Sequence, residues 1–172
     1  MRLHSSLLGA GVIKNRATSR GTSIANRSRM QILDMTRAEI DDVLRAQQLA
    51  RLACQAGGRP YIVPVAYAFD GETLFVHSLE GEKVRIMRAN PRVCVQVDAI
   101  DGFSSWRSVL AWGDYEELHG EEARAALRLL VERFLPPGAA PDGDPFAPPG
   151  MEDKVVLFRV RLGETSGRAS RP

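Results

Sequence analysis

Six stretches of the chain alternate between apolar side chains and polar or small ones, which is the period-2 pattern of strands with two distinct faces. We expect these strands at residues 49–55, 61–69, 73–78, 92–100, 105–118 and 154–162. Asp70-Gly71 lies between the second and third stretches and supplies the positive-φ chemistry of a two-residue hairpin turn. Gly113-Asp114 interrupts the fifth stretch and predicts a bulge or bend, as expected where a sheet curls into a barrel.

Three further stretches have the apolar spacing of helices. Thr36 and Glu39 form a capping-box pattern ahead of the first apolar stripe. A short helix starts near Glu82 and ends at Asn90-Pro91, because the residue before a proline is pushed out of the α region. Residues 120–135 carry the third stripe. Several antiparallel strands with peripheral helices predict a mainly β fold, a small antiparallel barrel.

The length of 172 residues predicts a single domain with one hydrophobic core, placed at residues 30–163. Residues 1–29 are rich in Arg and Ser, and we expect a disordered basic extension; a transit peptide and a translation start at Met30 are the alternatives. Residues 136–150 hold six of the ten prolines and predict a long flexible loop. Residues 164–172 offer no core-forming side chain and predict a flexible tail.

Charge and cysteine content narrow the classes of function. Six Lys or Arg residues and no acid precede Asp34, so the remaining 17 basic and 21 acidic residues make the domain mildly acidic. Nucleic-acid binding by the basic arm is therefore a weak alternative, also because the arm lacks interleaved aromatic residues. No apolar run approaches the length that spans a bilayer. We expect a cytoplasmic protein in which Cys54 and Cys94 are buried free thiols rather than a disulfide, and no metal site, since the histidines are scattered.

The strongest candidate for chemistry is the junction between the strand at 73–78 and the short helix. The strand delivers His77 and Ser78 to its end, and the helix that follows carries Lys83, Arg85 and Arg88. Free N–H groups and the helix dipole favour an anion at a helix N-terminus, and a lysine adds a full charge. The alternative is a solvated basic helix face paired with the neighbouring glutamates.

Two strands hold further candidates. Trp106, Ser108 and Trp112 share one face of the strand at 105–118; core packing explains an aromatic residue there, whereas a hydroxyl on an apolar face needs a partner. Pro64 lacks a ladder N–H and marks either an ordinary edge strand or a place where strand pairing yields to a ligand.

The order and spacing of several short motifs resemble the pyridoxamine 5′-phosphate oxidase-like family of FMN-binding split-barrel proteins. The similarity is strongest to the branch with nitroimidazole-resistance and flavin-nucleotide-binding proteins. The motifs are Leu74-Phe75-Val76-His77-Ser78, Gly81-Glu82-Lys83, Arg88-Ala89-Asn90-Pro91, and Arg107-Ser108-Val109 followed by Gly113. The resemblance implies a split β-barrel homodimer with FMN at each of two subunit interfaces.

The resemblance also implies roles for individual residues. Lys83 matches the lysine that binds the flavin phosphate, His77 lies beside the flavin as the candidate proton donor, and Ser108 contacts the flavin across the dimer. The remaining candidates for cofactor binding are Val63, Pro64, Val65 and Tyr67, whose strand lines the isoalloxazine ring, together with Ser78, Arg88 and Trp106.

Two departures from the family pattern bear on function. Glu82 replaces an arginine that is common in pyridoxamine 5′-phosphate oxidases, so one phosphate contact is missing or is supplied by Arg85 or Arg88. The chain also lacks a C-terminal segment with Trp and His residues, which argues against that oxidase activity in the strict sense. We expect a flavin-dependent oxidoreductase that reduces small nitroaromatic or quinone-like molecules. The alternatives are a non-catalytic flavin-binding stress-response module and a deazaflavin or haem in place of FMN.

Overall fold

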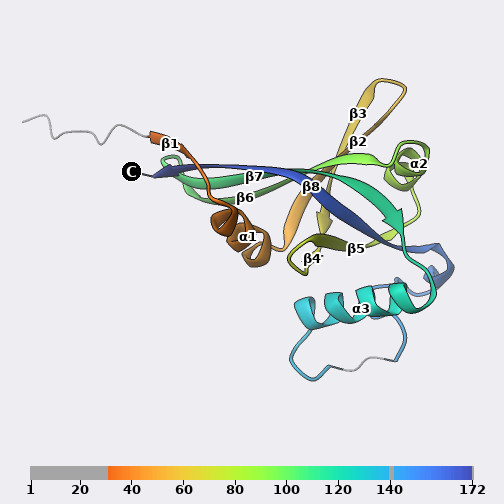
Figure 1. The fold of residues 1–172 in the computed structure, drawn as a ribbon. Helices are drawn as coiled ribbons and strands as arrows, with labels where there is room; N and C mark the ends of the chain where they lie inside the picture. Colours follow the sequence, from red (N-terminus) through yellow and green to blue (C-terminus); the bar gives the residue numbers. More distant parts are fainter. Residues whose placement is uncertain (1–30, 140–141, 172) are drawn as a thin grey trace, which may run out of the picture.

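The computed structural model describes residues 31–139 and 142–171, the last without its side chain. Eight strands form one antiparallel sheet in the order β3-β2-β6-β7-β8-β5-β4, and β1 pairs with the far half of β8 (Figure 1). The strands are β1 (Gln31–Asp34), β2 (Leu49–Ala56), β3 (Arg59–Ala66), β4 (Ala68–Phe69), β5 (Thr73–Leu79), β6 (Arg92–Gly102), β7 (Ser105–Glu117) and β8 (Val155–Arg171). The helices are α1 (Arg37–Ala46), α2 (Glu82–Ala89) and α3 (Gly120–Phe134), with a 3-10 turn at Glu152–Lys154. The predicted mainly β, antiparallel split-barrel class with peripheral helices is confirmed.

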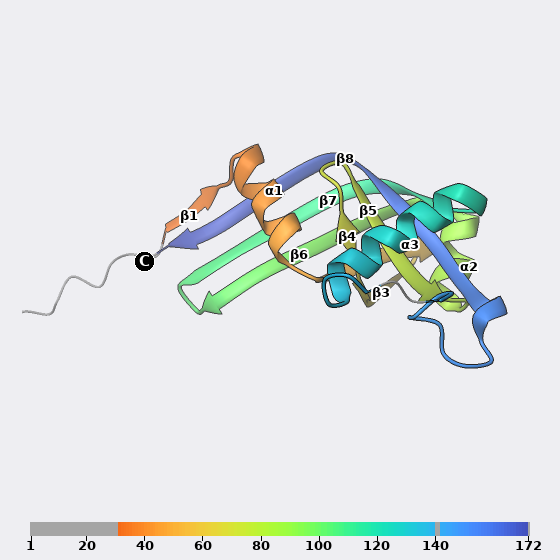
Figure 2. The same cartoon turned by 90° about the horizontal axis from the view of Figure 1, so that it is seen from below.

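The strands have one buried face and, over β2, β3, β6 and β7, one open face. Leu52, Val95, Val97 and Val109 are buried side chains of the inner face, where they pack with Phe158 of β8. The register of these strands places the intervening residues on the other side, which we call the outer face. Figure 2 shows α1 and α3 lying on one side of the long strands. Neither of these two helices covers the outer face.

Helix α1 begins as the sequence predicts. The Thr36 hydroxyl accepts a hydrogen bond from the backbone N–H of Glu39, whose carboxylate accepts one from the N–H of Thr36 at 2.8 Å. The apolar stripe of α1 is buried, and Leu44 near its end uses its backbone carbonyl to accept a 2.8 Å hydrogen bond from the Tyr67 hydroxyl. This bond ties α1 to the chain between β3 and β4.

The predicted flexible tail is wrong, because residues 164–171 continue β8. This half of the strand pairs with β7 on one side and with β1 on the other, so its backbone groups are bonded in both directions. Its small side chains let α1 pack closely: a Cβ at Gly167 would lie 2.8 Å from Ile40 and 2.9 Å from Met35. Ala169 and Ser170 are buried. Small residues here are a packing feature, and the sequence pattern alone indicated a frayed end.

The predicted hairpin between residues 61–69 and 73–78 is also largely wrong. Strand β3 pairs along its length with β2, and only Ala68 and Phe69 of β4 pair with β5. The chain changes partners at Tyr67, whose N–H donates to the carbonyl of Gln48. The turn itself lies one residue later than predicted, between Asp70 and Thr73. The bulge predicted at Gly113 is confirmed by a register shift between β7 and β8. The basic extension predicted at residues 1–29 lies outside the described residues.

Candidate functional site

The junction between β5 and α2 exposes backbone donors. The first hydrogen bond of α2 runs from the N–H of Arg85 to the carbonyl of Gly81 at 3.1 Å. The three preceding N–H groups, of Glu82, Lys83 and Val84, therefore have no acceptor within the helix. Gly81 precedes the helix without a side chain that could cap them. An anion placed here would accept hydrogen bonds from these N–H groups and would be stabilised by the positive end of the helix dipole.

Lys83 is the one predicted site residue at this junction that carries an uncommitted charge. Its side chain is half-buried, and within residues 31–139 and 142–171 it makes no ion pair and no hydrogen bond. Desolvation lowers the pKa of its amine, and the neighbouring Cys54 thiol opposes that effect in part. A bound anion would compensate this charge, so the junction fits a phosphate group.

Arg85 and Arg88 do not share this freedom. Arg85 donates to Glu82 at 2.9 Å, an exposed pair within one turn of α2. Arg88 bridges Glu80 and Glu117, with hydrogen bonds of 3.1 Å and 3.0 Å. The alternative of a basic helix face paired with glutamates thus describes both arginines. Neither of them is free to replace the phosphate contact that Glu82 removes.

His77 and Ser78 point to opposite faces of β5. The buried Ser78 hydroxyl donates to the carbonyl of Leu79 at 2.8 Å. His77 faces the loop that follows α3, where its Nε2 lies 2.9 Å from Oδ2 of Asp144. The ring of Phe146 packs edge-on at a centroid distance of 5.6 Å. With 13% of the His77 side chain exposed, the predicted proton donor is covered by this loop.

The outer face carries a small polar network among apolar side chains. Ser108 finds the partner that its position predicts, because Gln96 Nε2 lies 3.4 Å from its hydroxyl and 3.2 Å from Asp98. Asp98 also accepts a 3.0 Å hydrogen bond from Arg51 of β2. Trp106 is half-buried opposite Ile100 of β6. Sequence reasoning missed Arg51, Gln96 and Asp98; their alternation with buried residues was visible, but only the register brings them together.

The residues predicted on β3 divide between the two faces. Val63 and Val65 pair with Leu52 and Ala50, buried residues of the inner face, and Tyr67 is fully buried. Pro64 lies on the outer face opposite Arg51. A hollow of about 370 Å³ adjoins Pro64 and is lined by Leu49, Ala50, Arg51, Ile62, Val63 and Pro64. The predicted site residues therefore do not form one cluster. Lys83 lies at the start of α2, His77 lies under the loop after α3, and Pro64, Trp106 and Ser108 lie on the outer face. The others, apart from the exposed Arg88, lie on the inner, buried side of their strands.

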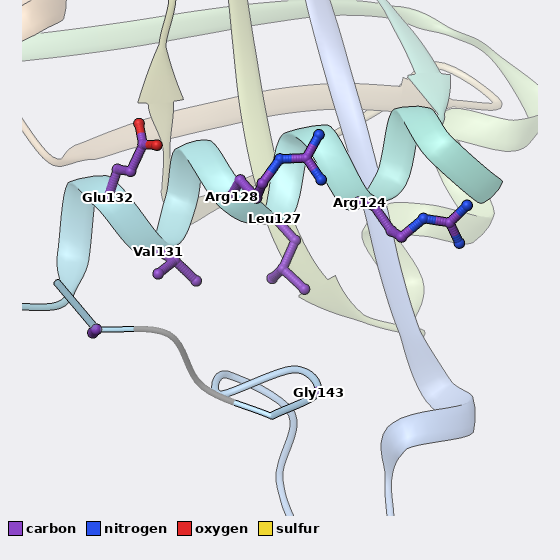
Figure 3. A pocket seen from close by; sticks show the side chains of 7 residues that line it. Arg124, Leu127, Arg128, Val131, Glu132 and Gly143 are labelled. Carbon is purple, nitrogen blue, oxygen red and sulfur yellow. The ribbon is translucent and has the colours of Figure 1, made fainter.

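A separate hollow of about 540 Å³ lies between α3 and the loop after it (Figure 3). Leu127 and Val131 point from α3 toward the loop. Arg124 and Arg128 also contribute to the lining of the hollow. None of the predicted cofactor-binding residues lines this hollow.

Comparison with known proteins identifies a family and individual proteins that this chain resembles. The sequence profile of the pyridoxamine 5′-phosphate oxidase family matches residues 36–169. An uncharacterized protein of Rhizobium meliloti (strain 1021) is 34% identical over 141 residues, which cover 79% of this chain and 93% of that protein. The crystal structure of an FAD-binding protein from Mesorhizobium loti superposes with a TM-score of 0.64 at 32% identity, covering 84% of this chain and 100% of the other.

A more distant structure has the same fold. It is that of a candidate 5-nitroimidazole antibiotic resistance protein from Bacteroides thetaiotaomicron, with a TM-score of 0.67 and 20% identity. The match covers 83% of this chain and 89% of that protein. Among the described residues, no helix is both long and apolar enough to cross a membrane.

Proposed function

The chain belongs to the pyridoxamine 5′-phosphate oxidase family, and from this we propose that it binds a flavin nucleotide whose phosphate end is held by Lys83 at the start of α2. The observation that carries the proposal is Lys83, which is half-buried and makes no ion pair or hydrogen bond with the described residues. It lies beside three backbone N–H groups that have no acceptor within α2. A phosphate dianion would accept hydrogen bonds from the backbone N–H groups and from the Lys83 ammonium group. The ion pair would compensate the loss of water around the lysine charge.

We propose further that two copies of the chain associate through their outer faces, with a flavin ring at each edge of the interface. Five large apolar side chains of this face, Leu49, Ile62, Ile100, Leu110 and Trp112, are between 37% and 70% exposed. Large apolar side chains exposed on one face in this number mark an interaction surface. A second copy is the occupant that the family resemblance implies. The network around Ser108 and the hollow beside Pro64 would then lie next to the flavin.

The flavin supplies electron transfer, and we propose that small nitroaromatic or quinone-like molecules accept the electrons. The residues of the chain would anchor the phosphate, orient the ring and exclude water. For His77 to act as the proton donor, the loop that carries Asp144 and Phe146 would have to move away from β5. That covering contact favours, as a second candidate function, a module that binds flavin without turnover. We propose a cytoplasmic location for the protein. The free thiols of Cys54 and Cys94 agree with a reducing compartment.

Purified protein tests the proposal directly. Its absorbance spectrum should show a flavin, and chromatography of the released cofactor should distinguish FMN, which the sequence motifs imply, from FAD, which the Mesorhizobium loti relative binds. A deazaflavin or haem spectrum would contradict the flavin assignment. Reduction of the bound flavin by NAD(P)H, followed by reoxidation with a nitroaromatic compound, would support the oxidoreductase. Bound flavin without either step would support the non-catalytic module.

A further inference from the structure

The proposed phosphate site has too few positive charges for a dianion. Glu82 places a negative charge in the first turn of α2, and Arg85 and Arg88 are engaged by glutamates. Lys83 alone supplies one charge. A second cation near the start of α2 would balance the phosphate and offset Glu82.

The β2–β3 hairpin brings such a cation to the correct side. Ala56 pairs with Arg59 next to the turn, and Cys54 pairs with Tyr61 two residues away from it on each strand. Since alternate residues of a strand share a face, Arg59 lies on the same face of the hairpin as Cys54. That is the face next to Lys83, because the Cys54 thiol lies within electrostatic reach of the lysine. Asn90, at the other end of α2, donates to the carbonyl of Gln55 at 3.1 Å and holds the helix against β2.

The charges themselves support this placement. The pKa of the Glu82 carboxyl is lowered chiefly by its hydrogen bond from Arg85, and the charge of Arg59 lowers it further. Arg59 is exposed, and in the described part of the chain it forms neither an ion pair nor a hydrogen bond. Its guanidinium therefore acts electrostatically on the first turn of α2 and, among the described residues, has no partner that would hold it from a ligand. A guanidinium also suits phosphate through paired N–H donors.

We infer that Arg59, at the tip of the β2–β3 hairpin, is the second phosphate-binding cation of this chain and acts together with Lys83. The inference rests on the proposed flavin site and adds to it a residue from a different element. It gives the hairpin tip a function that follows from its register, and it explains how the site accommodates Glu82. The arginine binds the phosphate end only, so it should affect ligands in proportion to their phosphate charge.

The test compares FMN with riboflavin, which lacks the phosphate, on protein freed of its cofactor. We expect Arg59→Gln to weaken FMN binding about tenfold, the effect of losing one charged hydrogen-bonding group, and to leave riboflavin affinity within about twofold. Arg59→Lys should recover part of the loss. Arg128→Gln, an exposed arginine of α3, serves as the matched control and should change neither affinity. Thermal melting of each variant verifies that the fold is intact.

The outcomes separate the inference from the proposed function. Unchanged FMN affinity in Arg59→Gln, with weakened affinity in Lys83→Met, would remove Arg59 and leave the flavin site standing. An equal loss for FMN and riboflavin would assign Arg59 to the fold or the ring and overturn its phosphate role. Wild-type protein that binds neither ligand would overturn the proposed function, and the inference with it.

Discussion

Replacing Lys83 by methionine removes the charge at the start of α2 and keeps an unbranched side chain in its half-buried place. A charged hydrogen bond to phosphate contributes about 1.5–3 kcal/mol, so FMN affinity should fall by about ten- to a hundredfold. Riboflavin affinity should stay unchanged. Lys83→Arg, which keeps the charge, should retain more FMN binding than Lys83→Met. Titrating flavin with the cofactor-free wild-type and variant proteins, and recording the quenching of flavin fluorescence, measures each of these affinities.

The same substitution should not destabilise the cofactor-free protein. Desolvation lowers the pKa of Lys83 in the folded state, so folding disfavours its charged form. This penalty is fully present below the folded-state pKa and disappears as the pH rises toward the ordinary value of 10.5. At pH 7 the methionine variant should therefore melt at the same temperature as the wild type or higher. A lower melting temperature, or FMN affinity equal to that of the wild type, would refute the reasoning.

Three other predictions concern the fold, the interface and the surface charges. Tyr67→Phe leaves the buried carbonyl of Leu44 without its hydroxyl donor, so it should lower the free energy of unfolding by about 1–3 kcal/mol. Urea titrations measure this value, and an unchanged free energy would show that the hydrogen bond is dispensable. Leu110→Glu places a charge on the outer face and should yield monomers in light scattering, whereas unaltered dimers would exclude this face as the interface. Hydrogen bonds from Arg159 and Arg161 lower the pKa of Glu116 to about 2. Its contribution to stability should therefore persist above the ordinary carboxyl pKa and be lost as the pH falls toward 2. Carboxyl NMR should show that midpoint, and Arg159→Gln should raise it.

Local signals in the sequence predicted most of the elements. Each of these signals acts over about one helical turn. The Thr36–Glu39 capping box marks the start of α1, and Asn90-Pro91 marks the end of α2, as predicted. Alternation located β2, β5, β6 and β7 within a few residues, and it located the start of β8 but not its end. Partner choice, in contrast, depends on distant segments. Nothing near Tyr67 indicated that β3 would pair with β2 rather than fold back on β5.

The candidate site shows the same division. Lys83 could be identified because a lysine in the first helical turn follows directly from the local pattern. The partners of Arg88 and His77 could not be identified, since Glu117 and Asp144 lie 29 and 67 residues away in the chain. The C-terminal half of β8 escaped prediction for a related reason. Its glycine, alanine and serine residues pack against α1, and the value of a small side chain depends on its neighbour.

The most direct test of the phosphate site is the crystal structure of the protein with its flavin bound. We predict the phosphate group within hydrogen-bonding distance of Lys83 Nζ and of the backbone N–H groups in the first turn of α2, in a dimer joined through the outer faces. A phosphate bound elsewhere, for example in the hollow between α3 and its following loop, with Lys83 facing solvent, would contradict the account.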